Sequence, residues 1–158
     1  MNGVVRIAPA AWDDADVQRL TAAQQAELRA RYGGAGEPGT PPSAADVTVV
    51  LLARDGDGAA VGCGALRDLG DGAAELKRMF VVPAARGRGI SKAVLAALET
   101  AARERGWTTL RLETGPRQPE AVALYERAGY RAIEAFGAYR DDPGAAGSLF
   151  YERRLDPA

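Results

Sequence analysis

The stretch AELKRMFVVPAARGRGIS, residues 74–91, constrains the fold more than any other part of the chain. Its first half is rich in the β-branched and large apolar residues that favour strands, and Pro83 cannot continue a strand's hydrogen-bond ladder. A glycine-rich turn, residues 86–89, follows, and an apolar repeat of helical period begins at Ile90. Such a turn leaves backbone N–H groups unpaired beside the positive end of the helix dipole, which favours a phosphate-bearing ligand. The stretch therefore predicts a strand, an anion-binding turn and a helix in succession.

The sequence before and after this stretch contains both strand-type and helix-type patterns, as in a mixed α/β protein. Two connections that contain Asp-Gly, residues 55–58 and 69–72, separate three runs of strand-type residues and predict an antiparallel meander. We predict a single domain over residues 1–158, a sheet with helices packed on it. Pro9 is expected to end the first strand. The predicted strands span residues 4–8, 47–54, 60–67, 74–82, 107–113, 130–133 and 149–155, and the helices about 17–32, 90–105 and 118–128.

The chain contains no histidine and one cysteine, Cys63. The absence of histidine removes the commonest general base and the commonest transition-metal ligand, and it excludes Ser-His-Asp and Cys-His catalysis. We therefore expect no metal site. A lone cysteine excludes an internal disulfide, and in a strand it is expected to be a small buried hydrophobe rather than a nucleophile.

Charge and hydropathy indicate which binding partners and which cellular location to expect. The formal net charge is −1, which gives no indication of nucleic-acid or membrane binding. No apolar run approaches the ~20 residues of a membrane-spanning helix. The first residues lack the basic and then apolar build of a secretory signal. We therefore expect a cytoplasmic protein.

Two motifs carry a resemblance to a known family. The run V-x-P-x-x-R-G-x-G-I, residues 81–90, resembles the acetyl-CoA-binding motif of the GNAT superfamily of N-acetyltransferases, and residues 121–130 match its later motif A-x-x-L-Y-x-x-x-G-[FY]. Other phosphate motifs fit less well, because a P-loop would need Gly-Lys-Ser/Thr where Gly89 is followed by Ile90, and Lys92 replaces the third glycine of the dinucleotide fingerprint. The resemblance covers about residues 47–155 and implies a GNAT-like mixed, mostly antiparallel central sheet flanked by helices.

The resemblance also implies an activity and a set of site residues. Acetyl-CoA is the implied co-substrate, and its acetyl group would pass to a primary amine of a small molecule or peptide by direct attack. Tyr125 is the implied general acid for the departing CoA thiolate, and Glu75 the candidate general base, directly or through a water. Backbone N–H groups near Phe80 or Val81 would hold the oxyanion. The implied cofactor-binding residues are Phe80, Val81, Val82, Arg86, Gly87, Arg88, Gly89, Ile90, Ser91 and Gln118.

Two of these positions depart from the family's pattern. Ser91 stands where glycine or alanine is usual, and Gln118 where many relatives have an asparagine that bonds the pantetheine arm. Tyr125 on an apolar helix face also fits simple core packing, and Glu75 also fits a solvated carboxylate at a strand edge. A non-catalytic acetyl-CoA-binding regulatory module is the alternative to an enzyme.

The acceptor side is less defined. The glycine- and proline-rich segment 33–45 fits either a surface loop or a lid over a substrate site. Arg67, Arg78 and Tyr139 are candidate contacts for an acidic small molecule. Because side chains alternate along a strand, Glu75, Lys77 and Arg78 cannot all face the groove. The identity of the amine and the oligomeric state, a homodimer included, are left open.

Overall fold

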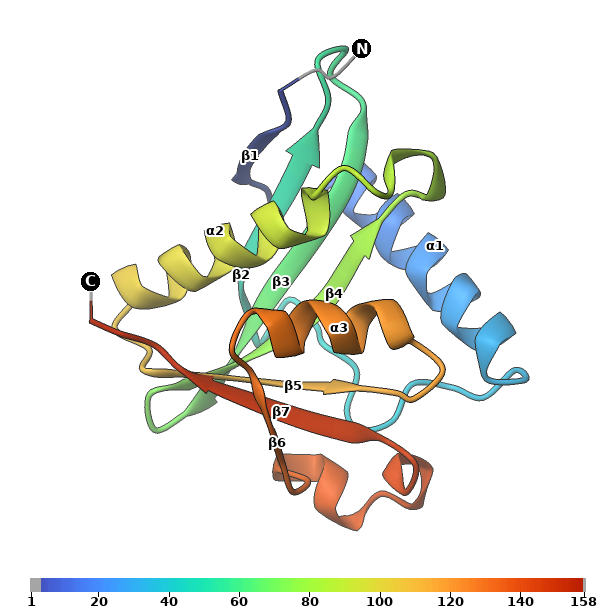
Figure 1. Cartoon of the computed structure of the whole chain (residues 1–158), viewed down its shortest axis with the longest axis vertical. Coiled ribbons are helices and arrows are strands. Elements are labelled where there is room, and N and C mark those ends of the chain that lie inside the picture. Colours follow the sequence, from blue (N-terminus) through green and yellow to red (C-terminus); the bar gives the residue numbers. More distant parts are fainter. Residues whose placement is uncertain (1–3, 158) are drawn as a thin grey trace.

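The computed structural model describes residues 4–157; residues 1–3 and 158 of the predicted domain lie outside them. Seven strands form one sheet in the order β1-β2-β3-β4-β5-β7-β6, in which only β4 and β5 are parallel (Figure 1). The mixed, mostly antiparallel sheet is therefore confirmed. The strands are β1 (Arg6–Pro9), β2 (Val47–Arg54), β3 (Ala60–Gly70), β4 (Ala73–Val81), β5 (Thr109–Thr114), β6 (Arg131–Ile133) and β7 (Leu149–Arg154).

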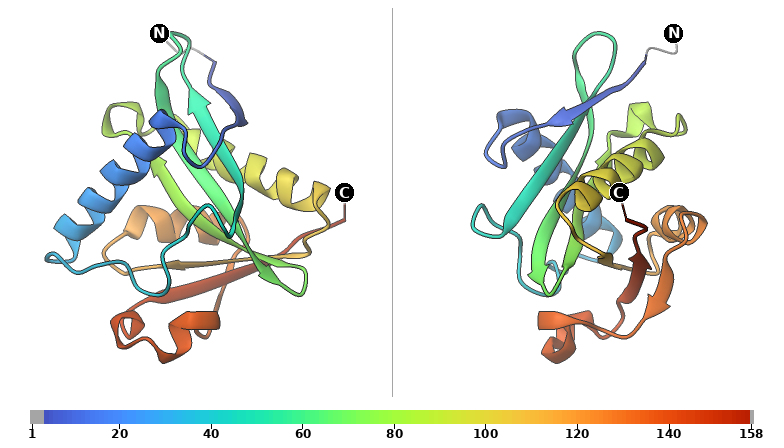
Figure 2. Two further views of the ribbon diagram at one scale, coloured as in Figure 1. Left: turned by 180° about the vertical axis from the view of Figure 1, so that it is seen from behind. Right: turned by 90° about the vertical axis from the view of Figure 1, so that its left-hand side faces the viewer.

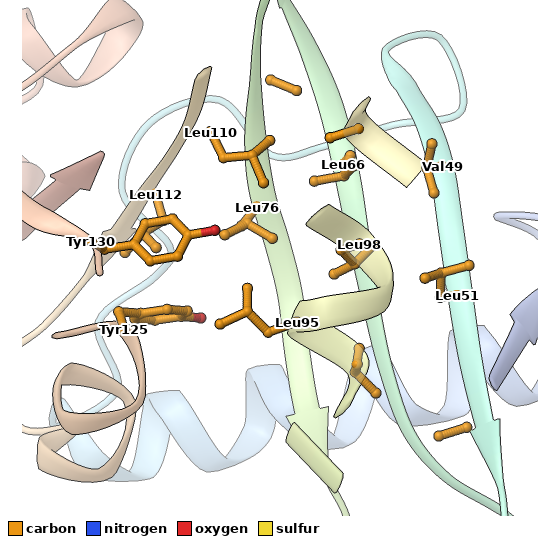
Figure 3. Close-up of a cluster of buried hydrophobic side chains, with 14 of the residues drawn as sticks. Val49, Leu51, Leu66, Leu76, Leu95, Leu98, Leu110, Leu112, Tyr125 and Tyr130 are labelled. Atoms are coloured by element: carbon orange, nitrogen blue, oxygen red, sulfur yellow. The ribbon is translucent and has the colours of Figure 1, made fainter. Parts of the chain in front are cut away.

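Helices cover both faces of the sheet. In Figure 2, α1 lies on one side of the meander, and α2 and α3 lie on the other. The largest group of buried side chains joins the sheet to α2 and α3 (Figure 3), and a second group places Val17 and Leu20 of α1 against β2 and β3. No helix within residues 4–157 is long and apolar enough to cross a membrane. The helices are α1 (Ala15–Arg31), α2 (Ile90–Glu104) and α3 (Pro119–Arg127), with short 3₁₀ helices η1 (Pro83–Ala85), η2 (Gly137–Asp141) and η3 (Pro143–Ala145).

The first strand ends at Pro9, as predicted. This proline is its last paired residue and lies opposite Leu51 of β2. β1 is the edge strand of the sheet. A proline is tolerated there because the side away from β2 needs no ladder hydrogen bond.

A bulge in β4 decides which side chains face the candidate site. Cys63 pairs with Phe80, and Ala65 pairs with Lys77, so Gly64 of β3 opposes both Arg78 and Met79. Arg78 adopts a left-handed backbone with φ of 60°. The extra residue breaks the alternation of side chains. Lys77 and Arg78, which strict alternation would put on opposite faces, consequently share a partner on one face, Glu37. Strict alternation, on which the expectation for these residues was based, therefore does not hold for this pair.

β4 and β5 separate soon after they begin. They are paired only from Ala73 to Glu75 on β4, opposite Thr109 to Arg111 on β5. Beyond that point the two strands diverge in Figure 1. Within the described residues, no strand pairs with the later part of β4 on its β5 side. This split in the sheet connects its two faces.

Candidate active site

A first cavity lies at the start of α2, on the side of the sheet that α2 and α3 cover. Its volume is about 240 Å³. Gly87 and Gly89 have φ of 80° and 76°, and a Cβ added to either would meet no protein atom within 4 Å. These glycines therefore serve the turn conformation and leave open space for a ligand at the helix N-terminus. Seven of the residues that the sequence predicts to bind the cofactor line the cavity, namely Phe80, Val81, Arg86, Gly87, Gly89, Ile90 and Ser91.

Three predicted cofactor-binding residues lie elsewhere. Val82 packs against the core, and its N–H donates to the carbonyl of Val61. Arg88 is exposed and does not line the cavity. Gln118 lies at the start of α3 in a second cavity, where its Nε2 donates to the hydroxyl of Tyr32 at 3.3 Å. The amide of Gln118 thus faces a different space from the glycine turn.

Arg86 lines the first cavity, but protein groups already hold its guanidinium. Nε donates to the carbonyl of Val81 at 2.9 Å, and Nη2 bonds Glu27 of α1 at 2.9 Å. The side chain thus ties the turn to α1 and to β4. Its position indicates a role in shaping the turn.

The second cavity opens on the opposite side of the sheet and has a volume of about 390 Å³. The end of α1, β4, the end of β5 and two loops form its wall. Residues 35–38 of the glycine- and proline-rich segment belong to this wall, as do Gly144, Gly147 and Ser148 after η2. The segment 33–45 therefore lines a cavity rather than only the outer surface.

The two cavities share Met79 and Tyr125. Met79 belongs to the bulged part of β4, and Tyr125 comes from α3 and points toward β4 in Figure 3. The ring of Tyr125 is 6% exposed and packs edge-on against Tyr130. Burial, together with the nearby charge of Glu113, raises the pKa of Tyr125. This hydroxyl stays protonated at neutral pH and lies at the junction of the two cavities.

Glu113 is a candidate that the sequence analysis missed. It is the fifth residue of β5, between inward-facing Leu112 and Thr114, and its side chain lines the second cavity with Tyr125. Burial raises the pKa of Glu113 to about 7, despite the opposing hydrogen bond to Ser148. A carboxyl with such a pKa can accept a proton near neutral pH. The available signal was a carboxylate on the polar face of a strand just before the break at residues 114–116.

Glu75 is neither solvated nor at the wall of either cavity. Its side chain is 1% exposed; one oxygen accepts from Arg67 at 2.8 Å, and the other accepts from the hydroxyl of Tyr139 at 2.5 Å. Arg67 and Tyr139 also lie outside the cavities. The alternative interpretation of Glu75 as a solvated strand-edge carboxylate was therefore wrong, and Glu75 as the general base stays a prediction. Of the three predicted contacts for an acidic molecule, only Arg78 lines the second cavity.

We expect Glu75→Gln to lower the free energy of unfolding by about 2 kcal/mol, because a buried hydrogen-bonded charge loses its partner. Among its charged partners, Arg67 would keep the more distant carboxylate of Asp46 at 3.5 Å. Denaturant unfolding measures the change. Glu152→Gln, which breaks the more exposed pair with Arg111, is the matched control and should cost less than about 1 kcal/mol. An unaltered stability of Glu75→Gln would contradict the structural role.

Cys63 is buried in β3, as expected. Its thiol donates to the carbonyl of Arg78 at 3.2 Å, next to the bulge. Burial raises the pKa of Cys63 to about 12, so the thiolate is not formed at neutral pH. Cys63 is consequently a packing residue.

Comparisons with known proteins identify the family of the chain. Residues 9–130 match the model of the Acetyltransferase (GNAT) family. The chain is 44% identical to the IAA acetyltransferase of Azospirillum brasilense over 106 residues, which are 66% of this chain and 67% of that protein.

Two solved structures share the fold. A protein from Klebsiella pneumoniae, described as a candidate acyl-CoA N-acyltransferase, superposes with a TM-score of 0.82 at 38% identity, covering 97% of this chain and 99% of the other. A GNAT family acetyltransferase from Elizabethkingia anophelis, solved with acetyl-CoA bound, has a TM-score of 0.70 at 17% identity, covering 96% and 98%. The family match over most of the chain, together with the close relatives, shows that this protein belongs to the GNAT acetyltransferase family and is an N-acetyltransferase.

Proposed function

We propose that the protein transfers the acetyl group of acetyl-CoA to a primary amine of a small molecule or peptide by direct attack. The observation that carries this proposal is the meeting of two cavities from opposite faces of the sheet at Met79 and Tyr125. A donor entering along the glycine turn and an acceptor entering from the other face would meet there with no covalent enzyme intermediate.

The donor side fits the phosphates of acetyl-CoA. The first N–H groups of α2 have no partner within the helix, and the helix dipole is positive there. The family membership and the acetyl-CoA found in the E. anophelis relative support this donor. The thioester would lie in the split between β4 and β5, where backbone N–H groups of β4 near Phe80 or Val81 would stabilise the oxyanion.

The proton transfers are assigned to two side chains of the junction. An alkyl ammonium has a pKa of about 10 and must lose a proton before it attacks. We assign Glu113, rather than the buried Glu75, as the acceptor of that proton. The amine nitrogen then forms the bond to the acetyl carbon, and as the carbon–sulfur bond breaks, Tyr125 donates its proton to the departing sulfur. The second proton that the nitrogen loses restores the Tyr125 hydroxyl, and Glu113 releases the first to solvent. The products are the N-acetyl compound, CoA thiol and one proton.

An amine panel incubated with acetyl-CoA tests the activity. Thiol release that depends on an amine, with N-acetyl product detected by mass spectrometry, is the expected result. Binding of acetyl-CoA without product from any amine would instead favour the non-catalytic regulatory module.

Gly89→Ala tests the donor site. A side chain at this left-handed position costs about 1 kcal/mol of stability, and the methyl group would occupy the space reserved for the phosphates. We expect acetyl-CoA affinity, measured by calorimetry, to fall about tenfold or more. Gly58→Ala is the matched control: its φ is 82°, it also has open space, and it lies in the turn between β2 and β3. Equal affinities of the two variants would contradict the site.

A further inference from the structure

The carboxylate of Glu37 lies at the wall of the second cavity, and among residues 4–157 its hydrogen-bond partners are the cations Lys77 and Arg78. Arg78 holds it with two nitrogens, Nη1 at 2.5 Å from Oε2 and Nη2 at 3.1 Å from Oε1. Lys77 Nζ lies 2.8 Å from Oε2. The side chains of Glu37, Lys77 and Arg78 are 14%, 6% and 10% exposed. A planar guanidinium fork with a second cation is a carboxylate-binding site.

The backbone of β4 sets the direction of this cationic pair. The bulge in β4 turns both neighbouring side chains to one face, which regular alternation would not allow. Burial alone would raise the pKa of Glu37, but the hydrogen bonds and charges of Arg78 and Lys77 outweigh it and hold the pKa below its usual range. The pair therefore favours an ionised carboxylate over a protonated one.

The rest of the cavity has an excess of positive charge. Arg29 and Arg117 add to the cationic pair, and Glu113 is the only acidic lining residue besides Glu37 among residues 4–157. Without Glu37 in its place, the described wall would carry four basic groups and one acidic group. Such a cavity attracts an acceptor with an anionic group.

Glu37 is attached to the wall through its side chain. Within the part of the chain that the structure describes, the backbone groups of residues 36–38 make no hydrogen bond. The nearest backbone anchors are Ala35, whose N–H donates to the carbonyl of Tyr32 at 3.3 Å, and Gly39, whose N–H donates to Asp142 at 2.6 Å. A carboxylate that replaces Glu37 remakes the same ion pairs, so the exchange costs little.

We propose that the acceptor is an amine that also bears a carboxylate, and that this carboxylate displaces Glu37 from Arg78 and Lys77. The proposal rests on the proposed function, because the amine end must then reach Glu113 and Tyr125 in the same cavity. Arg78 and Lys77 are thus specificity-determining residues, and Glu37 is an internal occupant of the carboxylate site.

The first test compares acids with their amides as acceptors. The twenty L-amino acids, β-alanine and γ-aminobutyrate are each assayed against the corresponding carboxamide. For the best acceptor, kcat/KM of the acid should exceed that of the amide at least about tenfold, since charge-assisted hydrogen bonds are lost with the amide. Arg78→Met should bring the ratio close to one. Lys77→Met should also reduce the ratio. Lys77 does not have the left-handed backbone conformation of Arg78, so this variant replaces Arg78→Met in the test if Arg78→Met does not fold.

The second test measures the carboxylate site without catalysis. Glutarate, which carries no amine, is titrated into the protein by calorimetry. Glu37→Gln should bind glutarate about tenfold more tightly than wild type, because the competing carboxylate is gone. Glu134→Gln removes the same charge from an exposed position outside the cavities and should leave the affinity unchanged.

The outcomes separate this proposal from the proposed function. Acetylation that favours amides or simple amines, or glutarate affinity that is the same in wild type, Glu37→Gln and Lys77→Met, overturns the carboxylate site and leaves the acetyl transfer standing. Tighter glutarate binding by Glu37→Gln, with no amine acetylated, supports the carboxylate site and overturns the proposed transfer.

Discussion

Glu113→Gln is expected to lower kcat/KM for amine acetylation about 10³-fold at neutral pH, within the usual range for loss of a general base. The substitution keeps the shape of the side chain and removes its ability to accept a proton. Affinity for acetyl-CoA should change little, because Glu113 lines the second cavity only. Steady-state kinetics with a saturating donor measure the effect.

The pKa of Glu113 also predicts the direction in which activity changes with pH. The pKa of Glu113 is raised to about 7, and the residue accepts a proton only when it is ionised. Wild-type kcat/KM should therefore fall as pH decreases through about 7, in addition to the fall caused by protonation of the amine. Glu113→Gln should lose the step near pH 7 and keep only the titration of the amine.

Glu75→Gln is the control for the identity of the base. This variant is expected to keep the step near pH 7 while it loses stability. Loss of the step in Glu75→Gln, with the wild-type profile retained in Glu113→Gln, would return the role of general base to Glu75.

Tyr125→Phe is expected to lower kcat about 10²-fold, which corresponds to about 3 kcal/mol. The effect lies at the lower end of general acid catalysis because a thiol has a pKa of about 8.5 and its thiolate is already a fair leaving group. The ring remains, so acetyl-CoA affinity and the melting temperature should change little. The measurement is kcat at saturating amine, accompanied by a thermal melt.

Tyr130→Phe is the matched control for the acid. Tyr130 packs edge-on against Tyr125, but it lines neither cavity, and its hydroxyl donates to Glu99 at 2.9 Å. Its loss should cost about 1 kcal/mol of stability and spare kcat. If Tyr125→Phe retained full kcat, Tyr125 would be a core residue and the proton would come from water.

Local signals in the sequence determined most of the architecture. The order of strands and helices, the meander and the glycine turn were all predicted, because side-chain periodicity, Asp-Gly turns and a helix start depend on neighbours within a few residues. The glycines at positions 87 and 89 were assigned to the donor site for the same reason: their backbone conformation is a local property.

Only the tertiary structure decided which polar side chains meet. Glu75 and Glu113 each follow an apolar residue in a strand. Glu113 also precedes the break at residues 114–116, but only distant residues decide that Arg67 and Tyr139 bury Glu75 while Glu113 lines a cavity. Arg78 and Lys77 share a face because β3 and β4 pair with a bulge, which is a property of two strands together. Glu37 reaches them from a segment without regular structure, whose path depends on distant contacts with Arg67 and Asp142. The burial, the pKa and the solvent access of a side chain depend on all the residues around it, most of them distant in the sequence. The chemistry of the site could therefore be assigned only from the tertiary structure.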